Sequence, residues 1–432
     1  MRSRTNAAAD TTCRVLMLLE NSRFPGDNRV RREAATLVEA GFDVTVIAPA
    51  GRGQGWYEEI FGVRVYRFPA PRGGQGLWGY AWEYGYCMSV SFLLSLWILL
   101  RHGFDVVHAH NPPDTFVLLG GFFRLLGKKF VFDHHDLSPE MYHARFDGQG
   151  SSLVHRVLVG LEWLSCRLAN HVIATNESYK AMQMTRCGVP ESRITVVRNG
   201  PDLARVRLVP PDQQLRQKAP TIIGYVGEMG FQDGLDYLLR ALRHLIDDCG
   251  RSDFYCVLVG RGDAFDKLKA LAAQLQLDDH VWFAGRVSDE ELMRYLSTAD
   301  ICVDPDPSNP FTDRSTMIKL MEYMALGKPI VAFDLPEHRV TAGEAALYAQ
   351  ANNELDFARQ IMSLMDDPAA RAALGARGRR RIEERLEWRH QAQHLLEAYR
   401  RLCRARSTSA EATARGPGEP VLTGTTEVGA TR

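Results

Sequence analysis

The chain has 432 residues, of which 45% are hydrophobic and 24% are charged, and 52 basic residues balance 52 acidic ones. These values predict a globular protein of two or three domains with a substantial core. The formal net charge of zero excludes attraction of the whole chain to nucleic acid or to an anionic membrane, and we expect no nucleic acid partner.

The cysteines and the N-terminal residues predict a cytoplasmic protein. Eight cysteines are scattered through apolar runs without a C-x-x-C pair, which predicts reduced thiols. The opening residues, MRSRTNAAADTT, contain two arginines but no apolar run, so they do not resemble a secretory signal. Basic clusters at 29–32 and 377–381 are expected to be solvated helix faces.

The first half alternates apolar runs with helical patterns. Strands are predicted at 14–19, 44–48, 63–68, 106–110, 130–134, 172–175 and 194–197. Such alternation predicts a parallel sheet covered by helices on both faces. The longest apolar run, 86–100, contains three serines and is shorter than a membrane span of ~20 residues, so we expect a buried or half-buried helix.

Polar side chains gather at the predicted strand ends of this half. They are Glu20, Asn21, His108, His110, Asn111, Asp133, His134, His135, Asp136, Thr175, Asn176 and Glu177. The carboxyl ends of parallel strands form the ligand crevice of an open α/β sheet. Histidine, aspartate and asparagine supply the mixed donors and acceptors that sugar hydroxyls require. The H-x-H and D-H-H-D patterns lack helical i, i+4 spacing, and neighbours on a strand point to opposite faces, so no metal site is expected.

A proline-containing stretch, 200–220, is predicted to be a linker between the first series of strands and a second one. The strands of the second series are predicted at 222–226, 255–259, 281–284, 301–303, 330–333 and 346–348. Two doubly wound units joined in this way leave a cleft between them. We therefore expect domains at 13–205 and 218–385, a C-terminal helix at 386–405 that packs back on the first domain, and a disordered tail at 406–432.

The segment 300–334 has the pattern of a nucleotide-binding corner. Between two apolar strands, a short helix is predicted to begin at Ser315 and Thr316 and to carry Lys319 and Glu322 on one face. The backbone N–H groups and the dipole at a helix start favour a phosphate, with Lys319 one turn further in. The alternative is that Lys319 and Glu322 form an ordinary solvated pair.

Glycines follow several predicted strands, where they permit a close backbone approach or a tight turn. They are Gly26, Gly224, Gly227, Gly230, Gly260 and Gly262. None fits G-x-G-x-x-G or G-x-x-x-x-G-K-[ST], so the dinucleotide and P-loop fingerprints are missing.

Several segments stand in the order of a known family. They are NPPD at 111–114, FDHHDLSPE at 132–140, ATNESY at 174–179, RNGPD at 198–202, and ADICVDP and EYMALGKPIVAFD within 299–334. Over residues 13–403 the chain resembles family 4 retaining glycosyltransferases of the GT-B fold, and in particular the bacterial subgroup that builds lipid-linked surface polysaccharides. The resemblance implies two Rossmann-like domains facing across a cleft. The second domain would bind a nucleotide-sugar, usually a UDP-sugar, and the first would hold the acceptor.

The resemblance also implies residue roles. Glu322 would bind the ribose, while Ser315, Thr316 and Lys319 would hold the diphosphate. His134 or His135 would lie beside the donor sugar, with Asp136 and His110 orienting it or the acceptor. We take His134, His135, Asp136 and Lys319 as candidate catalytic residues. The candidate substrate contacts are Gly26, His110, Asn111, Asn176, Glu177, Gly227, Arg261, Arg314, Ser315, Thr316 and Glu322.

The sequence departs from the family pattern at the diphosphate. Arg314 stands where a glutamate is common, and the glycine turn GEMGFQDG has Glu228 and Asp233 where cations are common. Lys319, Arg314 and Arg261 or Arg286 would then have to neutralise the phosphates.

We expect metal-independent transfer of a hexosyl or N-acetylhexosaminyl group with retention, no cofactor, and a lipid-linked or glycan acceptor. The spacing of Asp304 and Asp306 suits a metal, but they lie in a proline-bounded turn. The aromatic residues at 78–86 predict peripheral contact with the inner membrane face, or else lie in the core. Alternatives are a non-catalytic nucleotide-sugar or glycan-binding protein and, more weakly, a dinucleotide-dependent oxidoreductase or epimerase.

Overall fold

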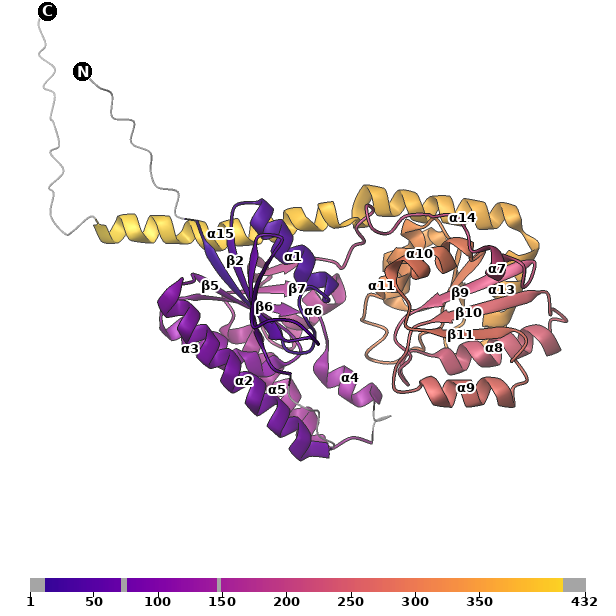
Figure 1. Cartoon of the computed structure of the whole chain (residues 1–432), viewed down its shortest axis with the longest axis horizontal. Helices are drawn as coiled ribbons and strands as arrows, with labels where there is room; N and C mark the ends of the chain where they lie inside the picture. Colours follow the sequence, from indigo (N-terminus) through magenta and orange to yellow (C-terminus); the bar gives the residue numbers. More distant parts are fainter. Residues whose placement is uncertain (1–11, 71–75, 146–148, 415–432) are drawn as a thin grey trace, which may run out of the picture.

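The computed structural model describes residues 12–70, 76–145 and 149–414, which form two α/β domains joined by a linker (Figure 1). Each domain is built around its own sheet, which is mostly parallel in the N-terminal domain and entirely parallel in the C-terminal one, with helices on both faces. The prediction of two doubly wound Rossmann-like domains is confirmed.

The N-terminal sheet has eight strands in the order β3-β4-β2-β1-β5-β6-β7-β8. They are β1 (Arg14–Leu18), β2 (Asp43–Pro49), β3 (Tyr57–Ile60), β4 (Val63–Phe68), β5 (Val106–His110), β6 (Lys129–His134), β7 (His171–Ala174) and β8 (Ile194–Val196). All neighbours are parallel except β3 and β4. Strand β3 was missed because it is a mostly exposed edge strand, YEEI, which has no continuous apolar run.

Helices cover both faces of this sheet. They are α1 (Asn28–Glu39), α2 (Gly76–Arg101), α3 (Val117–Leu125), α4 (Ser138–Arg145), α5 (Ser152–Leu168) and α6 (Glu177–Thr185), with short 3-10 turns at Asp114–Phe116 and Glu191–Arg193. Helix α1 begins where it does because the Asp27 side chain accepts hydrogen bonds from the first free backbone N–H groups of the helix.

The C-terminal sheet is entirely parallel, in the order β11-β10-β9-β12-β13-β14. Its strands are β9 (Thr221–Val226), β10 (Phe254–Val259), β11 (Val281–Gly285), β12 (Ile301–Asp304), β13 (Ile330–Phe333) and β14 (Ala346–Ala349). The helices are α7 (Gln213–Arg216) within the linker, α8 (Leu235–Asp247), α9 (Phe265–Gln274), α10 (Asp289–Thr298), α11 (Ile318–Ala325), α12 (Pro336–Ala342), α13 (Glu354–Asp366) and α14 (Pro368–Arg381), with a 3-10 turn at Gly343–Ala345 and a π turn at Ile382–Leu386.

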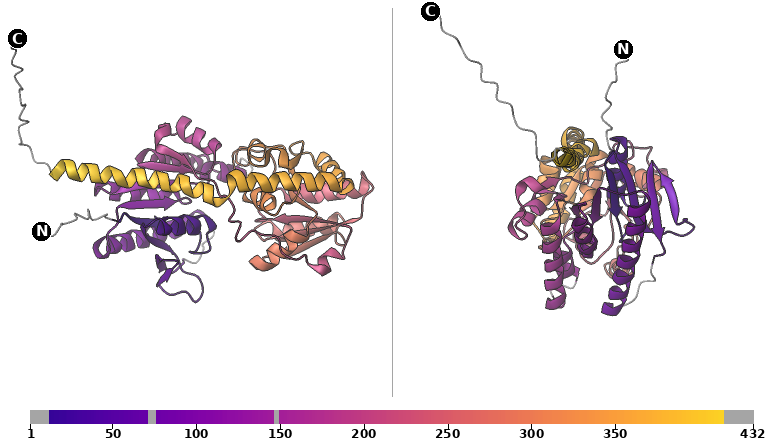
Figure 2. Two further views of the ribbon diagram at one scale, coloured as in Figure 1. Left: turned by 90° about the horizontal axis from the view of Figure 1, so that it is seen from above. Right: turned by 90° about the vertical axis from the view of Figure 1, so that its left-hand side faces the viewer.

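The last helix, α15 (Trp388–Ala414), returns to the N-terminal domain, and Figure 2 shows it lying along that domain in line with α14. The indole N–H of Trp388 donates to Thr36 Oγ1 at 3.0 Å. Tyr399 OH lies 2.7 Å from His108 Nδ1 beneath the sheet. Residues 406–414, predicted to be part of a disordered tail, are helical; residues 415–432 lie outside the described part of the chain.

Cys13 and Cys403 form a disulfide that ties the start of β1 to α15, with Cα atoms 6.3 Å apart. The expectation of reduced thiols is therefore wrong for these two residues. They are 390 positions apart in the sequence, so no local spacing pattern could predict the pair. The other six cysteines are free, as expected.

Candidate active site between the two domains

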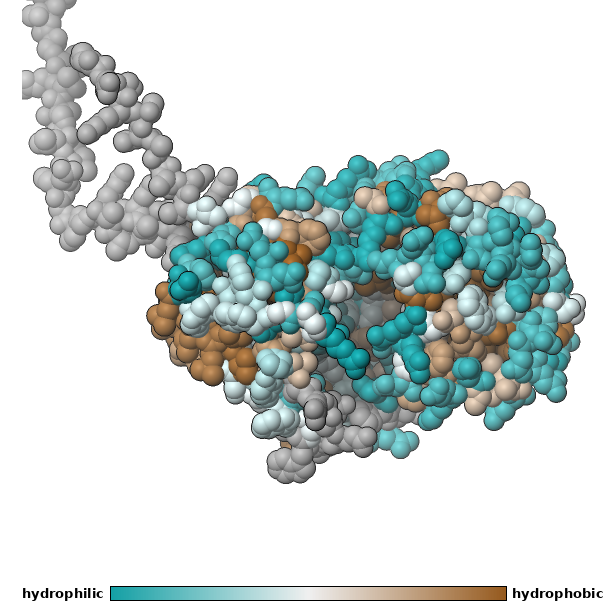
Figure 3. All heavy atoms as spheres, in the orientation of Figure 1, coloured by the Kyte–Doolittle hydropathy of each residue, from teal (hydrophilic) through white to brown (hydrophobic). Residues whose placement is uncertain are grey.

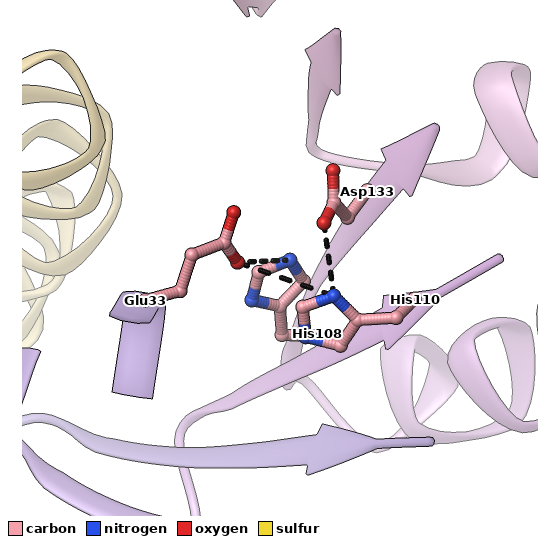
Figure 4. Close-up of side chains that lie close together, drawn as sticks. All are labelled: Glu33, His108, His110 and Asp133. Carbon is pink, nitrogen blue, oxygen red and sulfur yellow. Dashed lines mark hydrogen bonds and ion pairs between the residues drawn. The ribbon is translucent and has the colours of Figure 1, made fainter. Parts of the chain in front are cut away.

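A buried ionic cluster lies behind the carboxyl edge of the N-terminal sheet (Figure 4). Asp133, at the end of β6, accepts two hydrogen bonds of 2.7 Å from the Arg29 guanidinium and one of 2.9 Å from His110 Nδ1. Glu33 of α1 lies nearby, with Oε2 3.9 Å from His108 Nε2 and 4.0 Å from His110 Nδ1. The Asp133, Glu33 and histidine side chains of this cluster are fully buried.

Burial and mutual charge set the protonation of this cluster. Burial disfavours the charged form of Asp133, but Arg29 and His135 outweigh it and hold the pKa of Asp133 well below its ordinary value. Burial, reinforced by the charge of Asp133, raises the pKa of Glu33 to about 8. Burial opposes protonation of His135, but Asp133 overcomes it and raises the pKa of His135 to about 9. At neutral pH the Asp133 carboxylate is thus held between two cations, Arg29 and His135.

Arg29 shows that the expected solvated basic face at 29–32 is wrong at this position. Its side chain is only 5% exposed and also donates to Val197 O and to Asn199 Oδ1. The helical spacing of Arg29 and Glu33, which pair at 3.2 Å, is the sequence signal for this core pair. It was missed because the same spacing is common on solvated helix faces.

Glu33 makes the stability of the N-terminal domain depend on pH. A carboxyl group whose pKa rises from 4.5 to about 8 keeps its proton in the folded protein above pH 4.5, where the unfolded chain has lost it. The free energy of unfolding is therefore expected to fall as pH rises from 4.5 to 8, by up to about 1.4 kcal/mol per pH unit. Glu33→Gln should flatten this slope in urea unfolding. Glu39→Gln, an exposed position on the same helix, should not. Parallel pH profiles for Glu33→Gln and the unchanged protein would contradict the assignment.

The two adjacent histidines after β6 have different surroundings. His134 is fully buried, with Nδ1 3.1 Å from Gln183 Nε2 and Nε2 3.3 Å from Glu162 Oε1. His135 is 12% exposed and lies 3.4 Å from Asp133. The structure therefore places His135 at the open edge, while His134, a predicted catalytic residue, has no surface for a ligand.

Asn111 holds the loop that carries His135 and Asp136. Its Oδ1 accepts from both of their backbone N–H groups, at 2.8 and 3.1 Å, and its amide donates to the Asp136 carbonyl at 2.7 Å. Because Asn111 and His110 are fully buried, both are positioned to support the edge rather than to touch a ligand directly. Gly26 lies exposed in the loop before α1.

A polar seam joins the two domains at the start of α6. The Asn176 amide donates to the Arg314 carbonyl at 2.8 Å and to Thr316 Oγ1 at 3.0 Å. Ser315 Oγ lies 3.0 Å from Tyr179 OH. Glu337, buried on α12, accepts from Thr316 Oγ1 at 3.2 Å. The predicted contacts Asn176, Ser315 and Thr316 therefore come together, and their side chains bridge the domains.

Helix α11 begins at Ile318, with Met317 as its N-cap, two or three residues later than predicted. Thr316 and Ser315 therefore precede the helix. Their hydroxyls are committed to the seam, so they do not form a free phosphate-binding turn.

Lys319 is a buried cation held by two aspartates. Its Nζ donates to both Asp306 oxygens at 2.8 and 2.9 Å and lies 3.1 Å from Asp304 Oδ1. Burial lowers the pKa of Lys319, but Asp304 and Asp306 reverse this and raise it well above its ordinary value. The expected open cation is therefore wrong in this structure, and so is the alternative of a solvated pair with Glu322.

Glu322 is half-buried and lies close enough to Arg32 of the N-terminal domain for their charges to interact. Burial raises its pKa to about 7, partly offset by the charges of Arg32 in α1 and Arg205 in the linker. Arg205 also donates to Asn28 at 2.7 Å. Glu322 is thus a carboxyl group at the domain boundary, poised between its two protonation states near neutral pH. Figure 3 shows the molecule hollowed between the two domains.

The glycine loops of the C-terminal domain pack closely on one another. A Cβ on Gly260 would lie 1.8 Å from the Gly227 carbonyl, and one on Gly262 would lie 2.6 Å from that of Met229. These glycines are required by loop packing, whatever the ligand. Arg261 is exposed, with its guanidinium 4.9 Å from the Phe265 ring.

The remaining predicted substrate contacts, Arg314 and Glu177, are exposed to solvent. Arg314 is exposed and lines a pocket of about 520 Å³ together with Ser178, Met182 and Arg186 of the N-terminal domain. Glu177 is 66% exposed at the start of α6 and lies 3.8 Å from Lys180. Among the described residues, neither side chain forms a hydrogen bond or an ion pair with Lys319.

Two side-chain clusters among the described residues have the composition of metal sites. One is Glu33, His108, His110 and Asp133, and the other is Asp304, Asp306 and His338. In each cluster a protein cation already binds the carboxylates, Arg29 in the first and Lys319 in the second. A metal ion would have to displace that cation.

This pair of facing Rossmann-like domains, with polar strand edges at the cleft between them, defines the GT-B class of glycosyltransferases. Two family models match the chain: Glycosyltransferase Family 4 over residues 27–205 and Glycosyl transferases group 1 over residues 210–381. The chain belongs to this group 1/family 4 superfamily and is a glycosyltransferase.

Individual proteins agree with the family match. The chain is 23% identical over 390 residues to the 2-deoxystreptamine glucosyltransferase of Streptomyces kanamyceticus. The matched region covers 88% of this chain and 92% of that protein. Sucrose-phosphate synthase of Thermosynechococcus elongatus superposes with a TM-score of 0.75 at 19% identity, covering 91% of this chain and all of that one. Anabaena HepE, solved with UDP and glucose, superposes with a TM-score of 0.69 at 18% identity, covering 90% and 99%. At these identities the solved structures establish the fold alone.

Proposed function

We propose that the protein is a retaining glycosyltransferase that moves a hexosyl or N-acetylhexosaminyl group from a nucleotide-sugar, a UDP-sugar, to an acceptor hydroxyl. The single observation that carries this is the seam at Asn176, which joins the edge of the N-terminal sheet to the segment that leads into α11. His135 lies at the open edge of the N-terminal sheet. Glu322 of the C-terminal domain lies close enough to Arg32 of α1 for their charges to interact. The UDP complex of HepE supports a UDP-linked donor.

In this proposal the donor lies along the C-terminal domain, with Glu322 accepting hydrogen bonds from the ribose. His135 carries a positive charge at neutral pH because Asp133 stands behind it, so it donates a charge-assisted hydrogen bond toward the donor. The bond between the sugar and the diphosphate breaks, the acceptor oxygen bonds to the sugar on the same face, and the proton of the acceptor hydroxyl passes to the departing diphosphate. Positioning and stabilisation of the departing diphosphate supply the catalysis.

We propose that no metal ion or other cofactor takes part. The support is that both candidate ion clusters already contain a protein cation. We further propose a cytoplasmic enzyme of cell-surface polysaccharide or glycolipid biosynthesis with a lipid-linked or glycan acceptor. The family resemblance supports this role, as does the fold likeness to WaaG, a glycosyltransferase of lipopolysaccharide biosynthesis (TM-score 0.64, 15% identity).

Donor binding is tested by thermal shift with a panel of UDP-, GDP- and dTDP-sugars. We expect one UDP-sugar to raise the melting temperature by several degrees, because a ligand that binds only the folded state stabilises it by about 2.7 kcal/mol at one hundred times Kd. Glu322→Ala should abolish the shift, whereas Glu344→Ala, a glutamate outside the cleft, should keep it. Absence of a shift with every donor would contradict the proposal.

A second candidate is a nucleotide-sugar-binding protein without transferase activity, favoured by one observation: Lys319 is already neutralised by two aspartates. Release of free nucleotide together with glycosylated product separates the two. Donor binding without nucleotide release across an acceptor panel would favour the binding protein.

A further inference from the structure

Helix α2 exposes large apolar side chains, which is unusual on the surface of a water-soluble domain. Its inner side buries two serines, Ser91 and Ser95, and the Ser95 hydroxyl donates to the Ser91 carbonyl at 2.6 Å. Its outer side exposes Leu93 at 64% and Leu100 at 88%. A helix over a sheet ordinarily directs its apolar side chains inward, so the outer side of α2 is built for an apolar surrounding.

The length and composition of α2 also indicate an apolar surrounding for its outer side. The segment Trp82–Arg101 of α2 is long enough and apolar enough to cross a membrane, with a mean hydropathy of 1.4. Only 22% of it is buried. A core helix with that composition would be mostly buried. The helix cannot leave the domain to span a bilayer, because it connects β4 to β5 and packs Cys87 and Ile98 into the core.

Two neighbouring helices extend this apolar surface. Helix α3 packs against α2 through Phe92 and Phe122, whose ring centroids are 5.0 Å apart. It also lies against α5, where the Arg124 guanidinium reaches the Leu168 carbonyl. The outward residues of α3 include Leu118, Phe122 and Leu125, at one-turn intervals and 61%, 38% and 87% exposed. Figure 1 shows α2 beside α3, with α5 partly behind α2, and Figure 3 shows the hydrophobic surface over α3 and the adjoining part of α2.

Tryptophans surround this three-helix face. Four of the seven tryptophans of the chain are exposed there: Trp56 at 59%, Trp82 at 66%, Trp97 at 38% and Trp163 at 45%. Two carry an arginine over the ring, Arg101 over Trp97 at 5.8 Å and Arg167 over Trp163 at 5.7 Å. Tryptophan and arginine with apolar stems are favoured at the boundary between lipid chains and headgroups.

The charge of the face decides between a membrane and a second copy of the chain. Arginines 101, 124, 156 and 167 lie on the three helices. Among their described side chains the carboxylates are Glu83, which is half-buried, and Glu162, which is buried. Two such faces would bring like charges together, whereas an anionic lipid surface complements them.

We propose that α2, α3 and α5 form a face that inserts into the surface of an anionic lipid bilayer. This inference deepens the proposed function, on which it rests for the idea of a lipid-linked acceptor. Helices α2 and α3 follow β4 and β5, so they start at the edge of the sheet that carries Asn111 and lies toward the cleft. A bilayer on this face would hold a lipid-linked hydroxyl close to the cleft. The side chains of Trp78 and Tyr80, also expected to touch lipid, lie outside the described part of the chain.

The test is flotation of the full-length protein with vesicles of phosphatidylcholine alone or with 30% phosphatidylglycerol. The protein should float with the anionic vesicles, and Leu100→Ser/Leu125→Ser should weaken the binding by about tenfold or more, since each change removes an inserted leucine. Leu208→Ser, 61% exposed on the linker, should bind as the unchanged protein does. Arg101→Gln should weaken binding to anionic vesicles and make it less sensitive to salt.

Equal binding of the unchanged protein and the double leucine variant would overturn the proposal, as would equal binding to neutral and anionic vesicles. Dimerisation that the double variant abolishes, without vesicle binding, would assign the face to a second copy instead. Vesicle binding needs no donor, and donor binding by thermal shift needs no vesicle. Failure of this surface and failure of the proposed transferase are therefore seen separately.

Discussion

Replacing Asp133 with alanine should destabilise the N-terminal domain by about 3–5 kcal/mol, because it removes the carboxylate that accepts two hydrogen bonds from the buried Arg29 guanidinium. Arg29 is 5% exposed and makes two 2.7 Å bonds to Asp133. The loss would be measured by urea unfolding at pH 7. The pKa of His135 should also fall from about 9, since Asp133 is the main cause of its rise, and NMR titration of the ring would report this.

The matched control for this change is Asp334→Ala. Asp334 accepts two bonds of 2.6 and 2.8 Å from Arg339, so the paired groups are the same, but their side chains are 43% and 55% exposed. An exposed pair contributes about 0–1 kcal/mol. The double variant Arg29→Met/Asp133→Leu should recover part of the stability by removing both buried charges. If Asp133→Ala unfolds like Asp334→Ala, the cluster is not the buried ion pair described here.

Lys319→Met should have the second large effect, a loss of about 3–5 kcal/mol in the C-terminal domain at pH 7, because Asp304 and Asp306 would be left buried without their cation. Their side chains are 0% and 1% exposed. Burial and the neighbouring Asp304 already raise the pKa of Asp306 well above its ordinary value. The variant should therefore recover stability as the pH is lowered and the carboxylates take up protons, which urea unfolding at several pH values would show.

A second substitution separates the structural role of Lys319 from the role in holding the diphosphate that the family resemblance implies for it. Lys319→Met/Asp306→Asn removes one cation and one anion, so stability should return in part. If Lys319 holds the diphosphate when a donor is present, the stabilised double variant should still show no thermal shift with the donor. A normal shift in the double variant would limit Lys319 to a structural role. Lys180→Met, which removes a half-buried lysine paired with the exposed Glu191, serves as the control.

Much of the architecture follows from local patterns. The strand that contains Leu16, Met17 and Leu18 was predicted because helices cover both faces of its sheet, so consecutive side chains are all buried and apolar. Such an apolar run is visible in the sequence without knowledge of the neighbouring strands. Strand β3 gave no such signal, since an exposed edge strand of polar residues depends on its pairing with β4. The start of α11 was predicted too early because Ser315 and Thr316, good residues for a helix start, are used to join the domains instead.

The candidate site was only partly visible in the sequence. The polar strand ends at His110 and Asp133 were recognised because parallel strands bring their carboxyl ends to one edge. Their partners lie far away in the sequence, Arg29 104 positions before Asp133 and Glu33 77 positions before His110, on a helix where the same residue types ordinarily face water. Burial and pairing are properties of two segments together, so neither segment reveals them alone.

The sequence by itself determined two parallel sheets, their order along the chain and a membership in the group 1/family 4 glycosyltransferases, because apolar periodicity and short motifs are local. Tertiary structure alone decided that Lys319 is bound by Asp304 and Asp306, that Cys13 meets Cys403, and that the outer side of α2 is apolar. Each of these depends on which groups a folded chain brings within a few ångströms of one another and which it leaves facing outward. Coulombic attraction, disulfide formation and burial all depend on distances in the folded structure. The spacing of residues along the chain does not give those distances.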